Sequence, residues 1–311
     1  MVKNNRIAII IPCYNEAVTI GKVIDDFRNN LPEAKIFIYD NNSTDDTKLV
    51  AKKHKAIVRC EKTQGKANVV RTMFREIDAD VYLLVDGDNS YPANKAREMI
   101  KMIIDGDADM VLGDRLSLDY VKQNDRFGHV VGHRLVIKIV NKIFSANIHD
   151  VMTGYRGFSR RFAKSLSILS NGFELETEMV IFALNHKFRI CELPVRYKKR
   201  SKDSSSKLRT VPDGSKILLL IFNMVREYKP MLFFGFWALP AFVVGLVGTI
   251  IPVVEYLNTG LVLKLPTLVV GIVFLAVSLI LVAIGLICDL IVRKNKRMFE
   301  VMLNILAGMS S

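Results

Sequence analysis

The sequence lacks the short motifs that identify several large classes of enzyme. Its four cysteines form no CxxC pair and show no zinc spacing, so we expect free thiols rather than a zinc or redox site. A G-x-S-x-G nucleophile elbow is absent, which argues against a serine hydrolase, and no G-x-x-x-x-G-K-[ST] phosphate loop occurs. Residues 1–6 lead straight into a strand-like run without the apolar core of a signal peptide, so we expect residues 1–230 to be cytosolic.

Two long uncharged runs stand in the C-terminal third of the chain. Met231–Val254 and Leu265–Cys288 each hold 24 residues without a charge, and a helix needs roughly 20 residues to cross the hydrocarbon core of a bilayer. The alternative is a pair of buried helices in a soluble protein, but the runs have no polar face and only ten residues separate them. We therefore predict a transmembrane hairpin with helices over 231–257 and 265–291.

Basic residues flank this hairpin on one side. Between Arg196 and Lys229, ten Lys or Arg residues stand against three acidic ones, whereas the connecting loop contributes only Lys264. Four more basic residues follow the second run: Arg293, Lys294, Lys296 and Arg297. The positive-inside rule then predicts a cell-membrane protein whose two termini are cytoplasmic and whose loop near Asn258 lies outside.

The net charge of +13 is compatible with nucleic acid or with a membrane surface. Much of the excess lies beside the two apolar runs, where attraction to anionic lipid explains it. We find no surface on which aromatic and basic residues interleave, as a nucleic-acid module requires. The membrane is thus the expected partner, and nucleic acid is not.

The first 115 residues alternate between strand-like and helix-like segments. Strands are predicted over 6–12, 34–39, 56–59, 81–85 and 110–113, and helices over 19–29, 44–53, 66–77 and 93–104. This alternation predicts an α/β domain with a mostly parallel, Rossmann-like sheet and right-handed crossovers, whose ligands bind at the C-terminal ends of the strands. Further along, 130–144 reads as a helix and 213–230 as an amphipathic juxtamembrane helix.

Four acidic residues, Glu16, Asp40, Asp86 and Asp88, follow predicted strands and should meet at one edge of the sheet. Clustered carboxylates repel each other unless a cation, a ligand or a shared proton relieves them. Gly87 permits a tight turn between the last two acids, and Mg²⁺ prefers a few carboxylates together with phosphate oxygens. We expect a divalent metal, Mg²⁺ or Mn²⁺, at Asp86 and Asp88; the alternative is an ordinary Asp-Gly turn that ends a strand.

The order and spacing of these motifs resemble the family 2 inverting glycosyltransferases, which have a GT-A fold. The matching segments are Ile11–Glu16, Tyr39–Thr47, Gln64–Ala67 and Asp86–Asp88. The resemblance implies a cytosolic GT-A catalytic domain over 1–212 and a nucleotide-sugar site in which Asp40 contacts the base or ribose and Asp88 ligates the metal. The other donor-binding residues that it implies are Pro12, Tyr14, Glu16, Lys66, Asp86, Gly87 and Arg115.

The second half of the chain resembles a branch of that family, the polyprenyl-phosphate glycosyltransferases. The matching segments are Asp150–Phe158, Gly172–Glu178 and Arg200 with Ser206–Arg209. The branch implies that Arg126, Arg200 and Lys207 hold the acceptor phosphate and that Asp88, Asp150 and Arg200 form the catalytic group. Two departures stand out: Ser90 replaces a Gln that completes the metal shell in some relatives, and Asp203-Ser204 interrupts the Arg-x-x-Gly-x-Ser-Lys run.

The expected reaction is inverting transfer of a sugar from a nucleotide-sugar to a polyprenyl phosphate at the cytoplasmic membrane face, for modification of a cell-envelope glycan. A UDP-hexose is the expected donor, with GDP-mannose as the alternative. A processive polysaccharide synthase would need a Q-x-x-R-W block, and the single tryptophan is Trp237 in the first apolar run. A membrane-tethered, non-catalytic nucleotide-sugar-binding regulator and a synthase with another lipid acceptor stay open as alternatives. A homo-oligomer is also open, because the apolar part of the predicted cytoplasmic tail 292–311 can pack on a neighbouring subunit or on the membrane.

Overall fold

The computed structural model describes residues 5–117, 127–170, 172, 174–198, 210–261 and 263–308, although for 127–131, 210–218 and 306–308 only the backbone is described. The chain divides into two compact units, residues 1–220 and 221–311. The first unit is an α/β domain, and the second is built from two long helices.

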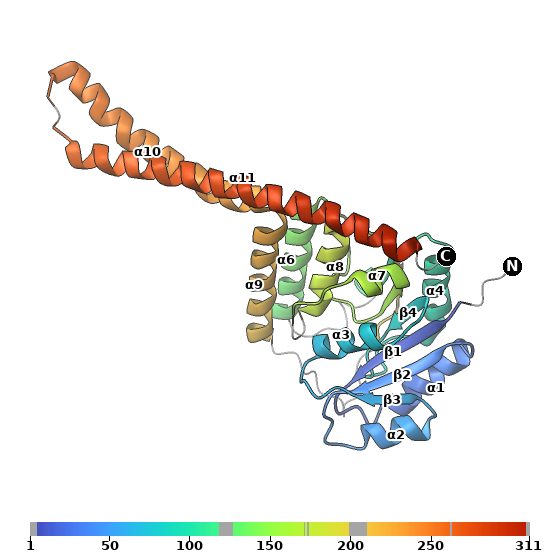
Figure 1. Cartoon of the computed structure of the whole chain (residues 1–311). Helices are drawn as coiled ribbons and strands as arrows, with labels where there is room; N and C mark the ends of the chain where they lie inside the picture. The colour runs from blue at the N-terminus through green and yellow to red at the C-terminus, as the bar shows by residue number, and fades with distance from the viewer. Residues whose placement is uncertain are drawn as a thin grey trace. The chain divides into compact units, whose positions relative to one another are not determined.

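The first unit is organised around a seven-stranded sheet of order β3-β2-β1-β4-β6-β5-β7 (Figure 1). All five strands expected from the sequence are present, each within one residue of its predicted ends. The strands are β1 Ile7–Cys13, β2 Lys35–Asp40, β3 Ile57–Cys60, β4 Val81–Leu84, β5 Met110–Asp114, β6 Arg156–Ser159 and β7 Ile190–Pro194. Strands β1 to β4 pair in parallel. In the β1–β2 pair, Ile9 lies opposite Ile36, and Cys13 lies opposite Asp40 at the C-terminal ends of the two strands. Strand β1 is almost wholly buried, as its apolar run predicts.

Strand β6 is the antiparallel member of the mostly parallel sheet that the sequence predicts. It lies between β4 and β5 and runs antiparallel to both, so the sheet is mixed and mostly parallel. Its four residues, Arg-Gly-Phe-Ser, show no strand pattern, which is why periodicity did not reveal it. The insertion brings the loop 150–155, which precedes β6, to the end of β4.

Amphipathic helices cover the sheet. The helices of this unit are α1 Ile20–Asn30, α2 Thr47–Lys53, α3 Lys66–Glu76, α4 Ala96–Ile104 after a 3-10 turn at Ala93–Lys95, α6 Phe127–Phe144, α7 Arg160–Ser165 and α8 Leu175–Asn185. Helix α1 buries Ile20, Val23, Ile24 and Phe27, and each such side chain contributes about 1.5–3 kcal/mol of hydrophobic stabilisation. Helix α7 begins at Ser159, whose hydroxyl accepts a hydrogen bond from the Phe162 amide at 3.2 Å.

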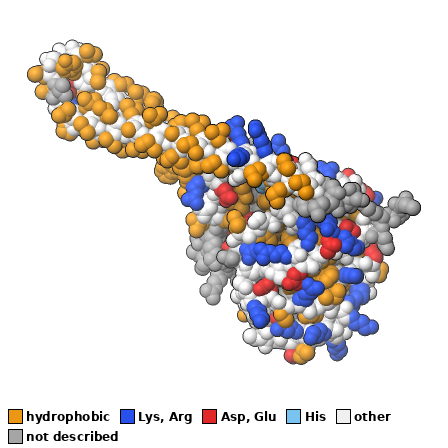
Figure 2. Space-filling model, viewed as in Figure 1, with side chains coloured by type: hydrophobic (Ala, Val, Ile, Leu, Met, Phe, Trp, Pro, Cys, Tyr) orange, Lys and Arg blue, Asp and Glu red, His pale blue; other side chains and the backbone are white. Residues whose placement is uncertain are grey.

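Two long helices follow α9 (Thr210–Tyr228): α10 Pro230–Thr259 and α11 Leu265–Gly308. Helix α10 ends at Gly260, whose left-handed φ of 70° suits glycine and whose amide donates to the Tyr256 carbonyl at 2.8 Å. Both helices are long and apolar enough to cross a membrane, and only 17% of each apolar window is buried. Figure 2 shows hydrophobic side chains over most of their visible surface. The exposure argues against a soluble core and suggests membrane association. Residues 292–308, expected as a tail, continue α11 as helix.

Small residues let α10 and α11 approach each other closely. A Cβ atom added at Gly271 would lie 2.6 Å from the Gly248 carbonyl carbon and 2.7 Å from the Thr249 amide nitrogen. Close backbone approach at glycines is a typical packing device of membrane helices.

Gly271→Leu is therefore expected to destabilise the hairpin, because its side chain has no room against α10. Overpacking of this kind costs about 1–3 kcal/mol, and thermal unfolding of the purified protein in detergent measures it. Gly235→Leu is the matched control, since a Cβ there meets nothing within 4 Å in the described structure. Equal melting temperatures for the two variants would contradict the packing argument.

Candidate active site

The loops after β1 and β4 meet at the C-terminal edge of the sheet. The Thr19 hydroxyl donates to the Gly87 carbonyl at 2.7 Å, which ties the start of α1 to the Asp86–Asp88 turn. A Cβ at Gly87 would lie 3.1 Å from Cys13 Sγ and 3.5 Å from Glu16 Cγ. The structure thus brings Glu16 and the Asp86–Asp88 turn together, beside Tyr14, which is 36% exposed. Pro12 pairs with Tyr39 within the sheet.

Asp40 lies at the end of β2 and is fully buried. Its Oδ2 accepts a hydrogen bond from the Ser43 amide at 3.1 Å and lies 3.2 Å from Lys48 Nζ. Its Oδ1 has no hydrogen-bond partner among the described residues. A buried carboxylate oxygen without a partner costs free energy, so this atom is suited to accept a hydrogen bond from a ligand.

Asp86 is joined to two distant parts of the chain through Lys66. The Lys66 Nζ lies 2.6 Å from Asp86 Oδ1 and 2.6 Å from Glu176 Oε1, so one ammonium group bridges two carboxylates. Burial disfavours the charged amine, but the charges and hydrogen bonds of Asp86 and Glu176 outweigh it and raise the pKa of Lys66. Lys66 is therefore a protonated, buried cation at physiological pH.

Gly154 packs directly against Asp86. A Cβ atom at this glycine would lie 2.1 Å from Asp86 Oδ2, a distance that no real Cβ contact reaches. The Gly154 amide donates to the Tyr91 hydroxyl at 2.8 Å, which holds the glycine in place. Position 154 thus admits only glycine while Asp86 keeps its position.

Gly154→Ala is expected to displace Asp86 and to lower the activity predicted from the sequence about 100-fold, because misplaced reacting groups cost this much. Activity assays at saturating donor measure the effect, with a melting curve to verify folding. Gly157→Ala, in the same segment, is the control: its Cβ would make only ordinary contacts, the nearest at 3.6 Å. Full activity of the Gly154 variant would mean that the Asp86 side chain can move away from residue 154 without loss of function.

Asp88 and Ser90 form the other half of the turn after β4. Asp88 is 3% exposed, and its Oδ1 accepts the Ser90 amide at 3.0 Å. The Ser90 hydroxyl is fully buried without a hydrogen-bond partner in the described part of the chain. No three His, Cys, Asp or Glu side chains converge on one point among the described residues. Two carboxylates and a buried hydroxyl fit a hard divalent cation that takes its remaining ligands from phosphate oxygens and water.

Asp150 and Arg115 form a buried ion pair. Arg115 Nε and Nη2 reach the two oxygens of Asp150 at 2.7 and 3.0 Å, and the Arg115 amide donates to Oδ2 at 3.1 Å. His133 Nε2 lies 3.3 Å from Asp150 Oδ1. Burial alone would raise the pKa of Asp150, but the charge of Arg115 and the contacts with Arg115 and His133 hold it well below its usual range. Asp150 is thus a fixed anion.

Arg115 is also covered by an aromatic ring. Its guanidinium carbon lies 5.5 Å from the ring centre of Tyr197, a cation–π distance. Tyr197 packs against Tyr91 at 5.3 Å, and Tyr91 in turn contacts Tyr155 at 5.3 Å. These rings connect Arg115 to the Gly154 loop and make the arginine side chain rigid.

Arg156 supports the loop that precedes β6. It is fully buried, and it donates to the Thr153 carbonyl at 2.8 Å and to the Val151 carbonyl at 2.7 Å. Burial lowers its pKa to about 10, partly offset by the charges of Glu176 and Asp150. The arginine remains charged at neutral pH and fixes the backbone between Asp150 and Gly154.

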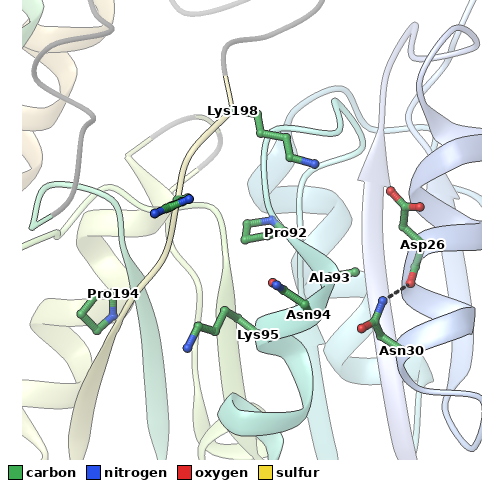
Figure 3. A pocket seen from close by; sticks show the side chains of 9 residues that line it. Asp26, Asn30, Pro92, Ala93, Asn94, Lys95, Pro194 and Lys198 are labelled. Carbon is green, nitrogen blue, oxygen red and sulfur yellow. Dashed lines mark hydrogen bonds between the residues drawn. The ribbon is translucent and has the colours of Figure 1, made fainter.

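A separate pocket of about 630 Å³ lies beside the segment that continues β7 (Figure 3). Its lining residues are Asp26, Asn30, Pro92, Ala93, Asn94, Lys95, Pro194, Arg196 and Lys198. None of the four acids predicted to bind the donor or metal is among them. Arg196 and Lys198 line this pocket, whereas Tyr197 between them covers Arg115.

The structure therefore brings together most of the residues singled out from the sequence. Arg126, Arg200 and Lys207, predicted to hold the acceptor phosphate, lie outside the described residues. Sequence reasoning left three features unassigned: the Lys66–Glu176 contact, the Gly154–Asp86 packing and the ring of Tyr197 on Arg115. All three join residues far apart in the chain, where spacing carries no information.

Comparison with known proteins defines the class to which this fold and site belong. The model of the family "Glycosyl transferase family 2" matches residues 8–167. Glycosyltransferase AglJ of Haloferax volcanii is 31% identical over 232 residues, which are 74% of this chain and 76% of that one. The chain belongs to glycosyl transferase family 2, as its motifs predict.

Relatives named for lipid-phosphate acceptors are found as well. A dolichyl-phosphate hexose transferase of Haloferax volcanii is 26% identical over 225 residues, covering 72% of this chain and 95% of the relative. The fold is that of glucosyl-3-phosphoglycerate synthase from Mycobacterium tuberculosis, solved with Mn²⁺, UDP and product. That structure has a TM-score of 0.58 and 16% identity, covering 71% of this chain and 80% of the other. The chain is thus a glycosyltransferase with polyprenyl-phosphate sugar transferases among its homologues.

Proposed function

We propose that this enzyme transfers a hexose from a UDP-sugar to a polyprenyl phosphate, with inversion at the sugar and with the help of Mg²⁺ or Mn²⁺. The observation that carries the proposal is the contact between the loop that holds Glu16 and the Asp86–Asp88 turn at one sheet edge, in a chain with two candidate membrane helices. A relative with a lipid-phosphate acceptor supports the choice of acceptor, and a fold neighbour with Mn²⁺ and UDP supports metal and nucleotide.

The donor would occupy the edge formed by β1, β2 and β4. Asp40, with its buried Oδ1 lacking a partner among the described side chains, would accept a hydrogen bond from the base or ribose. Glu16, with Pro12 and Tyr14, would surround the nucleotide. Asp86 and Asp88 would hold the metal, which neutralises the diphosphate as it leaves. Lys66 supplies further positive charge there.

The acceptor needs no strong general base. A phosphate monoester is largely ionised at pH 7, since its second pKa is about 6. One of its oxygens attacks the anomeric carbon, the bond from that carbon to the diphosphate breaks, and the electron pair leaves with UDP. The protein contributes positioning and charge stabilisation. Arg115, fixed by Asp150 and Tyr197, would orient the phosphates, and Arg126, Arg200 and Lys207 would hold the acceptor.

Incubation of the purified protein with undecaprenyl phosphate and separate donors tests the function. UDP-glucose, UDP-N-acetylglucosamine and GDP-mannose are each supplied with Mn²⁺, and the lipid product is identified by mass. We expect a sugar–phosphate–lipid with one UDP-sugar and no product when the unphosphorylated polyprenol replaces the acceptor. Absence of lipid-linked sugar with every donor would overturn the proposal.

We further propose that α10 and α11 cross the membrane and that both termini are cytoplasmic. The support is the exposure of their apolar side chains and the exposed basic residues Arg293, Lys294 and Arg297 near the C-terminus. A reporter placed at Asn258 should be accessible only from outside the cell. A cytoplasmic signal at this position would contradict the orientation.

A further inference from the structure

The ammonium group of Lys66 lies between the carboxylates of Asp86 and Glu176, which are far apart in the sequence. Lys66 is the first residue of α3, Asp86 follows β4, and Glu176 lies in the first turn of α8, 110 residues away from Lys66. The side chains of Lys66 and Glu176 are only 15% and 6% exposed. A buried, well-aligned contact of this kind fixes the ammonium group beside Asp86.

Among the described residues, the side chain of Glu176 is hydrogen-bonded to Lys66. Its Oε1 accepts the Lys66 hydrogen bond at 2.6 Å, while its buried Oε2 has no partner among the residues described. The α8 N-terminus favours a negative charge, and the buried charge of Arg156 also acts on this carboxylate. Both groups attract the carboxylate of Glu176, which can therefore retain Lys66 even when Asp86 is engaged elsewhere.

The Lys66 contact and a metal ion compete for the same face of Asp86. Oδ2 of Asp86 lies against the Gly154 backbone, where even a Cβ would come within 2.1 Å, and Lys66 covers Oδ1 at 2.6 Å. Two cations repel strongly at such distances. A metal that ligates Asp86 must therefore displace Lys66 from Oδ1, and the flexible stem of lysine permits a small movement of the ammonium group.

We propose that Lys66 is an internal counter-ion of Asp86 that is exchanged for the metal when the donor binds, and that Glu176 is the positioning residue that retains Lys66 during the exchange. In the donor-free enzyme, Lys66 neutralises Asp86. With metal and donor bound, Asp86 would be a ligand of the metal, and Lys66, still held by Glu176, would turn to the donor diphosphate. The inference rests on the proposed donor and metal.

The exchange predicts a coupling between UDP and Mn²⁺ that depends on Lys66. In the wild type, UDP draws Lys66 from Asp86 and thereby tightens Mn²⁺ binding. In Lys66→Met, Mn²⁺ alone is expected to bind about tenfold more tightly than in the wild type, and UDP is expected to add less. Coupling between two ligands is typically 5–150-fold, so a loss of this size is measurable.

Glu176→Gln should have the opposite effect on Mn²⁺. Without its anchor, Lys66 stays on Asp86 alone, so Mn²⁺ binding in the absence of UDP weakens several-fold. The double variant K66M/E176Q should again bind Mn²⁺ more tightly than the wild type, because the competing cation is gone. Lys22→Met is the charge control: it removes an exposed lysine that pairs with Asp26, and it should leave Mn²⁺ affinity unchanged.

The measurement is a Mn²⁺ titration of the full-length protein, with and without UDP, in which electron paramagnetic resonance detects the free Mn²⁺. Thermal unfolding verifies that each variant is folded. Unchanged Mn²⁺ affinity and unchanged UDP coupling in both K66M and K66M/E176Q would overturn the exchange. If K66M misfolds, the double variant carries the test, because it removes both buried charges. Failure of the wild type to bind either Mn²⁺ or UDP would instead overturn the proposed function.

Discussion

Replacement of Asp88 by asparagine is expected to lower sugar transfer by about 10²–10³-fold while the protein stays folded. The expectation follows from the loss of one anionic oxygen beside the leaving diphosphate, since removal of a single charge-stabilising group in an active site costs about 2.7–4 kcal/mol. The substitution preserves the shape of a side chain that is 3% exposed. Transfer from UDP-sugar to undecaprenyl phosphate at saturating Mn²⁺ is the assay.

Asp105→Asn is the matched control for this prediction. Asp105 is an exposed residue that follows α4, so its substitution should change neither activity nor melting temperature. Full activity of Asp88→Asn, with or without metal, would show that Asp88 is not a metal ligand needed for transfer. Loss of activity together with a large drop in melting temperature would assign a structural role to this carboxylate instead.

The second large effect is expected for Asp150→Asn, and it falls on stability as well as on activity. Asp150 is fully buried and accepts two side-chain hydrogen bonds from Arg115. Breaking a buried ion pair by removal of one charge costs about 3–5 kcal/mol, because the remaining charge is left uncompensated. Arg115 would also lose its orientation, so we expect transfer to fall about 100-fold.

The loss of stability in Asp150→Asn should depend on pH, because it comes from the charge of Asp150. The pKa of Asp150 is held below its usual range by the charge of Arg115, against the opposing effect of burial. A carboxylate whose pKa is lowered on folding stabilises the protein above its unfolded pKa of about 3.9, and the stabilisation is lost as the pH falls below that value. The part of the stability difference between wild type and Asp150→Asn that comes from the ionised Asp150 should therefore shrink as the pH falls below about 4.

Denaturant unfolding at several pH values measures this difference, and Asp26→Asn is the comparison. Asp26 forms an exposed ion pair with Lys22 at 3.0 Å, and such pairs contribute only about 0–1 kcal/mol. An Asp150 variant as stable as the Asp26 variant would show that the buried pair does not hold the site together.

The sequence alone was sufficient for the edge of the sheet at which we propose the donor site. Apolar runs at β1, β2 and β4 predicted buried parallel strands, and the acids that follow these three strands were therefore expected at the C-terminal edge of the sheet. The uncharged runs likewise predicted where α10 and α11 begin, to within a few residues. These are local properties, because strand and helix periods depend only on neighbouring residues.

Only the tertiary structure decided which distant groups touch. Asp150 was expected as a catalytic residue from its motif, and the structure pairs it with Arg115, 35 residues away; the proposed role is now to fix that arginine. Lys66 was expected at the donor, and it is found between Asp86 and Glu176. Strand β6 inserts antiparallel beside β4 and thereby places Gly154 on Asp86. Such contacts depend on how the elements pack, for which the spacing of residues along the chain carries no signal.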